Sequence, residues 1–352
     1  MFYDCAPVHN HVFACSNHFF FTAFSHLKTL DNKPPICSYG IVLQSNPILE
    51  SFGNARTARN DNSSRFGKYI DINFNAFGSL TSAAISTYLL EKVRLITPQP
   101  GERNYHIFYE ILSGVSQKER QQLRIGTLAA HDFKMTAASG TFDRRDGVSD
   151  KETYKDLLEA FDIMGFSCDE KLDLFSVACA LLHASNLTFQ VSTSDAGEAS
   201  ELELLNPSLR CCVDLLGVSV IALNEACCRF AIEARGETLY KNVSVPQARK
   251  AVEALIKATY QALFTCIARR INNLIEARQG RDAMKNGHCN GDKSHEPTAS
   301  IGVLDIFGFE SFEENSFEQL CINFCNEALQ QQFNSFVFKQ EQDEYKREGT
   351  CG

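Results

Sequence analysis

The sequence predicts an α/β fold that is mostly helical and contains part of a central sheet. Apolar or small residues fill positions 301–304, as expected for a short buried strand in a parallel sheet. Apolar residues alternate along residues 69–74, which is the period of a strand. Apolar residues also recur at steps of three and four over residues 252–274, and again from about residue 315. This spacing predicts two long amphipathic helices.

The amino-acid composition is typical of a globular protein. The chain has 352 residues, of which 44% are hydrophobic and 22% charged, enough for one large domain or two smaller ones. A net charge of −9 argues against nucleic-acid binding, which needs a basic face. No apolar run approaches the roughly 18 residues of a membrane span. The 14 cysteines lack the spacing of a disulfide framework, so we expect reduced, mostly buried thiols in a cytoplasmic protein.

Residues 1–40 differ from the rest, because they are rich in Phe, His and Cys and show neither a helix nor a strand period. The residue types that could bind zinc are Cys5, His9, His11, Cys15 and His18. Their spacing matches no zinc module, so we predict no metal site there. No basic segment precedes the apolar run, which argues against a signal peptide. We expect this N-terminus to be disordered or misassigned.

Several local signals predict helix ends. Asn46-Pro47 suits the start of a helix, because proline fits the first turn. Ser149 and Ser167 are each followed three residues later by a glutamate, which is the capping-box pattern. His183 lies near the end of the second of these helices, and we interpret it as a structural histidine. Residues 280–300 are polar and contain three glycines, so they are predicted to form a surface loop.

Two segments carry residues suited to phosphate chemistry. Asp305 follows the predicted strand at 301–304, where an acidic residue can hold Mg²⁺ beside nucleotide phosphates. Gly308 allows a backbone N–H to approach a phosphate closely. The polar run at 60–64 is rich in hydroxyl and amide groups, which can contact phosphate oxygens. Taken alone, that run could equally be an ordinary Asn/Ser turn.

These segments resemble two motifs of the myosin motor domain. DIFGFE at 305–310 is similar to switch II of that family, and the long helix after it to the relay helix. Residues 43–70 resemble the family's helix and switch I loop. The resemblance extends over 41–349, leaving 350–352 as a tail, and implies a P-loop NTPase-like fragment with part of the central sheet, the transducer. Kinesins and small GTPases also have two switches, but kinesins lack the phenylalanine of DIFGFE.

The resemblance implies ATP and Mg²⁺ as cofactors and assigns residues to both. Asn60 and Ser63 would contact phosphate. Ser64 would ligate Mg²⁺, and Asp305 would hold the metal through water. The N–H of Gly308 would bond to the γ-phosphate. These roles together describe a nucleotide site built from two separate segments.

The resemblance also implies a catalytic set. Ser63 would help to relay the proton of the attacking water, and the Gly308 N–H would contact the transferred phosphate. Arg65 and Glu310 would form a salt bridge that closes the site, and Glu310 would orient the water. Opposite charges on two mobile loops suit such a latch, because their attraction is strong only when closure excludes water. Movement of switch II would then shift the relay helix.

An actin-contacting loop of the family corresponds to residues 230–246. Glu237 lies 16 residues before Glu253, which begins a run (EALIK) similar to a family landmark. This spacing points to a family position that is either acidic or phosphorylatable, so the glutamate implies constitutive negative charge. The alternative is a solvated surface glutamate without a role in binding.

The expected function is that of a myosin heavy chain of undetermined class: a cytoskeletal motor of the myosin complex that hydrolyses Mg-ATP and moves on actin filaments. The sequence contains no G-x-x-x-x-G-K-[ST] phosphate loop, and its match stops after the relay helix, before the converter and lever arm. We therefore expect an incomplete motor that binds ATP weakly, hydrolyses little or none, and carries no light chains. The alternative is a non-catalytic remnant that serves as an actin-binding or interaction module.

Overall fold

The structure is a computed structural model that describes residues 38–76, 80–192, 199–234, 237–285, 299–311 and 315–349. The predictions made for residues 1–37 and 350–352 lie outside this part. The chain divides into two compact units, Met1–Asp305 and Ile306–Gly352. Each unit is described by itself.

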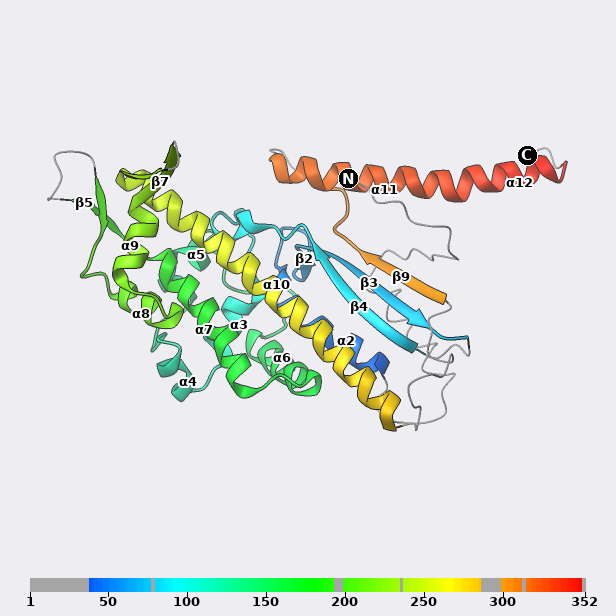
Figure 1. Cartoon of the computed structure of the whole chain (residues 1–352), viewed down its shortest axis with the longest axis horizontal. Helices are drawn as coiled ribbons and strands as arrows, with labels where there is room; N and C mark the ends of the chain where they lie inside the picture. Colours follow the sequence, from blue (N-terminus) through cyan, green and yellow to red (C-terminus); the bar gives the residue numbers. More distant parts are fainter. Residues whose placement is uncertain are drawn as a thin grey trace. The chain divides into compact units, whose positions relative to one another are not determined.

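A three-stranded sheet lies at one side of the first unit, next to helix α10 (Val245–Lys285; Figure 1). Strand β3 (Gly67–Phe74) lies between β4 (Leu80–Tyr88) and β9 (Ala299–Asp305). The alternation predicted along β3 is confirmed, because its apolar side chains at Ile70 and Ile72 are buried while the residues between them are partly exposed. One face of this strand therefore packs into the core.

The prediction of a parallel strand at 301–304 is wrong, because β9 pairs antiparallel with β3. Its register sets Ile301 opposite Ile72 and Val303 opposite Ile70. An apolar run indicates burial but carries no information about strand direction, which depends on the neighbouring strand. The strand itself is present as predicted, but among residues 301–304 only Gly302 is buried, so the predicted burial is mostly wrong.

The long helix α10 (Val245–Lys285) packs against β4, α2, α7 and α9 and runs along the sheet and helices of the first unit (Figure 1). The amide of Asn272 in α10 donates to the Ile85 carbonyl and accepts from the Ile85 N–H, both at 2.8 Å. The hydroxyl of Tyr260 donates to the Phe52 carbonyl at 2.7 Å. These bonds fix the helix against the sheet and against α2 (Ser38–Gly53).

The apolar stripe predicted for α10 is confirmed. Its members are all buried: Val252, Ile256, Tyr260, Leu263, Ile267, Ile271 and Leu274. The loop predicted from residue 280 starts too early, because the helix continues to Lys285. A glycine at this position costs about 1 kcal/mol in a helix, which the rest of a long helix can offset. The part of the predicted loop at 286–298 lies outside the described residues.

The prediction that a helix starts at Asn46-Pro47 is also wrong, because Pro47 lies inside α2. Proline lacks the N–H that the helix interior needs. The next residues, Ile48, Leu49 and Phe52, are fully buried. Their packing stabilises the helix across the proline, so tertiary contacts override the local signal.

The capping box predicted at Ser167 is confirmed. The Ser167 hydroxyl accepts from the Glu170 N–H at 3.1 Å, and the Glu170 carboxylate accepts from the Ser167 N–H at 2.8 Å. Ser149 also caps its helix, but through the N–H of Lys151 at 3.3 Å. His183 is buried and its Nε2 lies 3.1 Å from the Arg124 carbonyl, in keeping with a structural role.

The remaining elements of the first unit are mostly short. The helices are α3 (His106–Gly114), α4 (Gln117–Gln122), α5 (Lys134–Ala137), α6 (Asp150–Met164), α7 (Cys168–Ser185), α8 (Pro207–Leu216) and α9 (Val220–Cys228), with 3₁₀ turns η1 (Lys92–Leu95) and η2 (Ala130–Asp132). The strands are β1 (Asn54–Ala55), β2 (Ser63–Ser64), β5 (Phe189–Val191), β6 (Ser200–Leu202), β7 (Arg229–Ala234) and β8 (Glu237–Asn242). Strands β7 and β8 form an antiparallel hairpin where a loop was predicted over 230–246.

Membrane spans and cysteine pairing can be assessed for the described residues. No single helix among them has the length and apolar character of a membrane span. Helices α8 and α9 have this length and apolar character only when they are counted together, and the pair is bent by 103°. The nine described cysteines are free thiols, as predicted, but only four of them are fully buried. The prediction of mostly buried thiols is therefore only partly right.

The second unit is a long helical rod. Helix α11 (Phe317–Asn334) continues through a π-helical turn, η4 (Ser335–Lys339), into α12 (Gln340–Arg347). Ser316 begins α11 with a capping box to Gln319. The long helix predicted after residue 315 is therefore confirmed, with one π-helical turn in its course.

Candidate functional site

The switch I segment, defined here as residues 57–68, folds back on itself between β1 and β3. Strand β1 pairs antiparallel with β2, which contains Ser63 and Ser64. At the turn, the Thr57 N–H donates to the Asn60 carbonyl at 2.8 Å. The Asn60 side-chain oxygen accepts from the Asn62 N–H at 2.9 Å. A phosphate would therefore meet the Nδ2 amide of Asn60, because the side-chain oxygen already shapes the turn.

Asn62 ties this turn to two helices, a role that the sequence did not reveal. Its side-chain oxygen accepts from Asn54 Nδ2 at 3.0 Å and lies 3.2 Å from His106 Nε2. Its Nδ2 donates to Glu50 at 3.1 Å. Burial, and then the charge of Arg103, hold the pKa of His106 well below its usual range. The imidazole is thus neutral, and its Nε2–H can donate to Asn62.

The two predicted serines are positioned by the same strand. The Ser64 hydroxyl donates to the Phe66 carbonyl at 2.9 Å, and the Ser63 hydroxyl accepts from Arg65 Nη1 at 3.4 Å. Both side chains are half-buried. Ser64 keeps an oxygen with lone pairs that suits a hard cation.

A buried charge ladder, consisting of Arg65, Glu91, Arg94 and Glu102, joins the two ends of the switch I segment. Arg65 Nε and Arg94 Nε contact the same Glu91 oxygen at 2.7 and 2.8 Å. Arg94 Nη1 contacts Glu102 at 2.8 Å, and the other Glu102 oxygen accepts from the Ala58 N–H at 3.2 Å. The ladder therefore connects Ala58 at the start of the segment with Arg65 near its end.

The electrostatics of the ladder favour fully charged partners. Burial by itself raises the pKa of Glu91, but the charges of Arg94 and Arg65 and their hydrogen bonds outweigh burial and lower it. Each ladder side chain is at most 12% exposed. Charges buried to this degree are stable only when they are paired and hydrogen-bonded.

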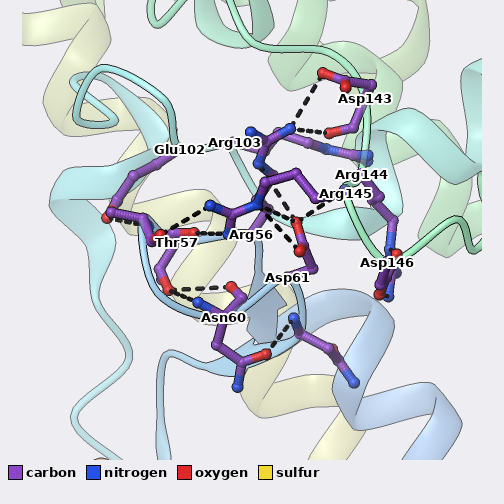
Figure 2. A network of polar contacts seen from close by, with 12 residues as sticks. Arg56, Thr57, Asn60, Asp61, Glu102, Arg103, Asp143, Arg144, Arg145 and Asp146 are labelled. Atoms are coloured by element: carbon purple, nitrogen blue, oxygen red, sulfur yellow. Dashed lines mark hydrogen bonds and ion pairs between the residues drawn. The ribbon is translucent and has the colours of Figure 1, made fainter.

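A second contact, which we call the surface clamp, consists of Arg145, Asp61 and Arg56 (Figure 2). Arg145 donates from its two terminal nitrogens to the carbonyls of Thr57 and Ala58, each at 2.8 Å. Its Nε lies 3.2 Å from the Asp61 carboxylate, and Arg56 Nε lies 3.4 Å from the same group. The clamp holds the outer turn of the switch I segment.

Asp305, the predicted metal residue, lies at the end of β9 directly opposite Lys68. Lys68 Nζ is 3.6 Å from the Asp305 carboxylate and donates to Asn46 Oδ1 at 3.1 Å. Serine and aspartate oxygens are the ligand types that Mg²⁺ prefers, so Ser64 and Asp305 fit the ion in kind. Among the described residues, no three His, Cys, Asp or Glu side chains gather as a metal site, so phosphate and water would supply the other ligands.

The other switch II residues belong to the second unit, where α11 fastens them. The Asn323 side chain accepts from the Glu310 N–H at 2.8 Å and donates to the Glu310 carbonyl at 2.7 Å. Asn326 Nδ2 donates to the Phe307 carbonyl at 3.1 Å. A Cβ on Gly308 would meet no atom within 4 Å, so no contact described in the chain requires glycine there. The predicted Arg65–Glu310 bridge joins the two units and stays a prediction.

Glu237, the predicted actin-binding residue, begins β8, where its backbone pairs with Ala234 of β7. The hairpin exposes two aromatic side chains, with Phe230 62% and Tyr240 69% exposed. Phe230 pairs with Lys241 and Tyr240 pairs with Ala231, so the two rings lie on opposite faces of the hairpin and each face exposes one aromatic side chain.

Comparison with known proteins identifies the family. The model of the myosin head (motor domain) matches residues 32–351. The chain is 40% identical over 307 residues to Myosin-2 of Lachancea kluyveri, covering 87% of this chain and 18% of that protein. It is 39% identical over 309 residues to unconventional myosin IC of Drosophila melanogaster, covering 88% and 28%. It is 41% identical over 307 residues to unconventional myosin-VIIb of Mus musculus, covering 87% and 14%.

The chain thus spans less than a third of the length of these relatives. Both the switch I segment and the 305–310 segment fall inside the matched region. From the motifs, the pairing of β9 with β3 and these matches, we conclude that the chain belongs to the myosin head (motor domain) family.

Proposed function

We propose that this chain provides the switch I and switch II parts of an actin-activated Mg-ATPase, a cytoskeletal motor of the cytoplasm. The observation that carries the proposal is the pairing of β3 with β9, which sets Asp305 opposite Lys68 at the end of the switch I segment. Two distant segments with phosphate-binding residue types thereby meet at one edge of a sheet. This is the arrangement that a nucleotide-sensing site requires.

Binding of the nucleotide would fall to the first unit. Asn60 and Ser63 would contact phosphate oxygens, and Ser64 would ligate Mg²⁺ while Asp305 holds the ion through water. Mg²⁺, when bound, supplies positive charge that neutralises the β- and γ-phosphates. Lys68 adds a further positive charge 3.6 Å from the Asp305 carboxylate.

Hydrolysis would use residues from both units. Ser63 would accept and pass on the proton of the attacking water, Glu310 would orient that water, and the Gly308 N–H would contact the γ-phosphate. Arg65 would latch onto Glu310. Glu91 and Ser63 already orient the Arg65 guanidinium, at 2.7 and 3.4 Å, so its side-chain entropy is largely lost before closure.

Transmission would run through the second unit. Asn323 and Asn326 fasten the backbone of residues 307–310 to α11. A shift of that backbone must therefore move the helix. About 30 helical residues at 1.5 Å each make a rod of roughly 45 Å, long enough to carry a displacement across a domain.

The polypeptide 1–352 by itself should bind ATP weakly and hydrolyse it little or not at all. Its sequence contains no G-x-x-x-x-G-K-[ST] motif, and such a loop supplies most of the grip on the β- and γ-phosphates. The test is titration of the purified chain with a fluorescent ATP analogue in Mg²⁺ or in EDTA, together with measured ATP turnover.

We expect weak binding that requires Mg²⁺ and is lost in Ser64→Ala and Asp305→Ala, with turnover far below that of a motor. Thr265→Ala, an exposed hydroxyl on α10, is the control and should bind like the parent. Binding that neither site variant weakens would overturn the nucleotide site. Turnover at a normal motor rate would overturn the expected inactivity.

The exposed hairpin supports a second candidate function, nucleotide-independent binding to actin filaments. Phe230 would supply apolar contact area on one face of the hairpin and Tyr240 on the other, and Glu237 would add negative charge. Co-sedimentation with actin should fall about tenfold or more in the double variant Phe230→Ser/Tyr240→Ser. Leu205→Ser, 91% exposed outside the hairpin, is the matched control. Equal co-sedimentation of both variants would exclude the hairpin as the contact.

A further inference from the structure

The loop between α5 and α6, residues 138–149, supports the switch I segment from outside through Arg145. The Arg145 guanidinium bonds two successive carbonyls, Thr57 and Ala58, at 2.8 Å each. Its backbone N–H also lies 3.2 Å from Asp61 Oδ1. Figure 2 shows Arg145 directed toward both Asp61 and Thr57. Four nitrogens of Arg145, the backbone N, Nε and both terminal nitrogens, therefore hold one turn of the segment.

The geometry of this contact requires a planar fork. Two carbonyls of adjacent residues can be met simultaneously by the two terminal nitrogens of a guanidinium, whereas the ammonium of lysine is a point charge on a flexible stem. Fixing both carbonyls fixes the peptide planes on either side of Ala58. Ala58 is also the residue whose N–H is bonded by Glu102 of the buried charge ladder.

The supporting loop is itself anchored at both ends. Ser139 Oγ donates to the Glu102 carbonyl at 2.6 Å. At the other end, the fully buried Arg103 bonds both oxygens of Asp150 at 2.8 and 3.2 Å. In the middle, Arg56 donates to the Asp143 carbonyl at 2.8 Å. The loop is thus a firm base, and Arg145 reaches from it to the switch I segment.

We propose that Arg145 is a positioning residue for the switch I segment and thereby sets its affinity for Mg-nucleotide. The proposal rests on the proposed function of that segment. Arg145 lies outside both switch motifs and 88 residues from Thr57. By holding the outer turn, it keeps Asn60 and the β2 serines in the arrangement that meets phosphate. Its loss loosens the turn without removing any group that touches the nucleotide.

Arg210 on α8 offers a charge-matched control. Its side chain is 79% exposed, and its Nε pairs with Asp214 of the same helix at 3.1 Å. Replacing Arg210 or Arg145 by methionine changes the net charge equally. A difference between the two variants reports the contact with the switch I segment and not the loss of a positive charge.

The test uses two readouts on the chain 1–352. The first is amide hydrogen exchange of residues 57–64 without nucleotide. The second is titration with Mg²⁺ and a fluorescent ATP analogue. In Arg145→Met we expect exchange about tenfold faster, because charge-assisted bonds to two carbonyls are lost, and binding weakened by a similar factor. Arg210→Met should match the parent in both, and Arg145→Lys should not restore either.

Chemical rescue separates positioning from a general loss of stability. In Arg145→Ala, a few millimolar guanidinium ion should slow the exchange of residues 57–64 again, whereas sodium chloride at equal ionic strength should not. Equal exchange in Arg145→Met and Arg210→Met, full restoration by lysine, or lack of rescue by guanidinium would each overturn the proposal. Slower exchange on rescue in a chain that binds no nucleotide would support the clamp and overturn the proposed function instead.

Discussion

The switch I segment is held in two different environments, and the contrast between them shows how each contact acts. The buried charge ladder holds the segment with side chains that are at most 12% exposed. The surface clamp holds it with Arg145, whose side chain is 43% exposed, although its partners Asp61 and Arg56 are only 13% and 10% exposed. Buried charges are costly when a partner is lost, whereas exposed pairs contribute about 0–1 kcal/mol.

This difference suggests a division of labour. The ladder makes the folded position of the segment nearly obligatory, because opening it would leave Arg65 or Glu91 buried without its charge partner. Release of Arg145 should cost less stability than loss of a ladder charge, because its side chain is 43% exposed and Asp61 keeps Arg56 as a partner at 3.4 Å. We therefore expect the ladder to control folding and the clamp to control the mobility of the segment.

The largest effect should follow from Glu91→Gln. The neutral amide leaves Arg65 and Arg94 without the carboxylate that both contact. Loss of one partner from a buried ion pair costs about 3–5 kcal/mol, so the free energy of unfolding should fall by about that amount in a urea titration. A loss below about 1 kcal/mol would contradict the view that the ladder is a folding element.

Protonation of Glu91 at low pH should destabilise the fold, as Glu91→Gln does. The pKa of Glu91 is lowered in the folded protein, so its charge stabilises the fold above its unfolded pKa of about 4.5. This contribution is lost as pH falls below that value through the lower folded pKa. Urea titrations between pH 3 and 6 should show the stability of the parent falling more steeply below pH 4.5 than that of Glu91→Gln. Parallel curves would show that Glu91 titrates normally.

Glu110 on α3 contrasts with Glu91, because burial outweighs the groups that lower its pKa. Burial raises its pKa to about 7, against hydrogen bonds from Ser51 and Thr153. A raised folded pKa means that stability is greatest below the unfolded value of about 4.5 and falls as pH rises through about 7. Between pH 5.5 and 8, the parent should lose about 2 kcal/mol relative to Glu110→Gln. An identical pH dependence in both proteins would show that Glu110 is ionised throughout.

Lys68→Met tests a partly buried pair between these extremes. The substitution keeps the length of the side chain but removes the charge beside Asp305, whose side chain is 22% exposed. We expect the free energy of unfolding to fall by about 1–2 kcal/mol, because a half-buried charge loses its partner. Lys171→Met is the control, since its partner Asp162 is 66% exposed. Equal losses in the two variants would show that water screens both sites alike.

The smallest effect should follow from Glu225→Gln. This carboxylate pairs with Arg229 at 3.3 Å on the surface, with side chains 55% and 49% exposed. An exposed pair one helical turn apart is worth about 0.3–0.5 kcal/mol, and 0.5 M salt should abolish it. If Glu225→Gln lowered the free energy of unfolding by more than about 1 kcal/mol, exposed and buried ion pairs would differ less in their contribution to stability than we expect.

Much of the candidate site could be predicted from the sequence, because motifs and periods are local. Asp305 was expected at a strand end and lies there. Ser63 and Ser64 were expected in the switch I segment, where the structure finds them in the short strand β2. The partners that hold these residues were not predicted. Asn62, Glu91, Lys68 and Arg145 show no pattern in the sequence that marks them as partners.

The sequence by itself determined the period of β3, the stripe of α10 and the capping box at Ser167, since each depends on residues within a few positions of one another. It also determined the order of the two switch motifs, because each motif is a short local segment. Only the tertiary structure decided that Pro47 lies within a helix, that β9 runs antiparallel to β3, and which charges pair. Arg65 meets Glu91 across 26 residues and Arg145 meets Thr57 across 88. Such contacts depend on how whole elements pack, and burial then makes the chosen pairs strong.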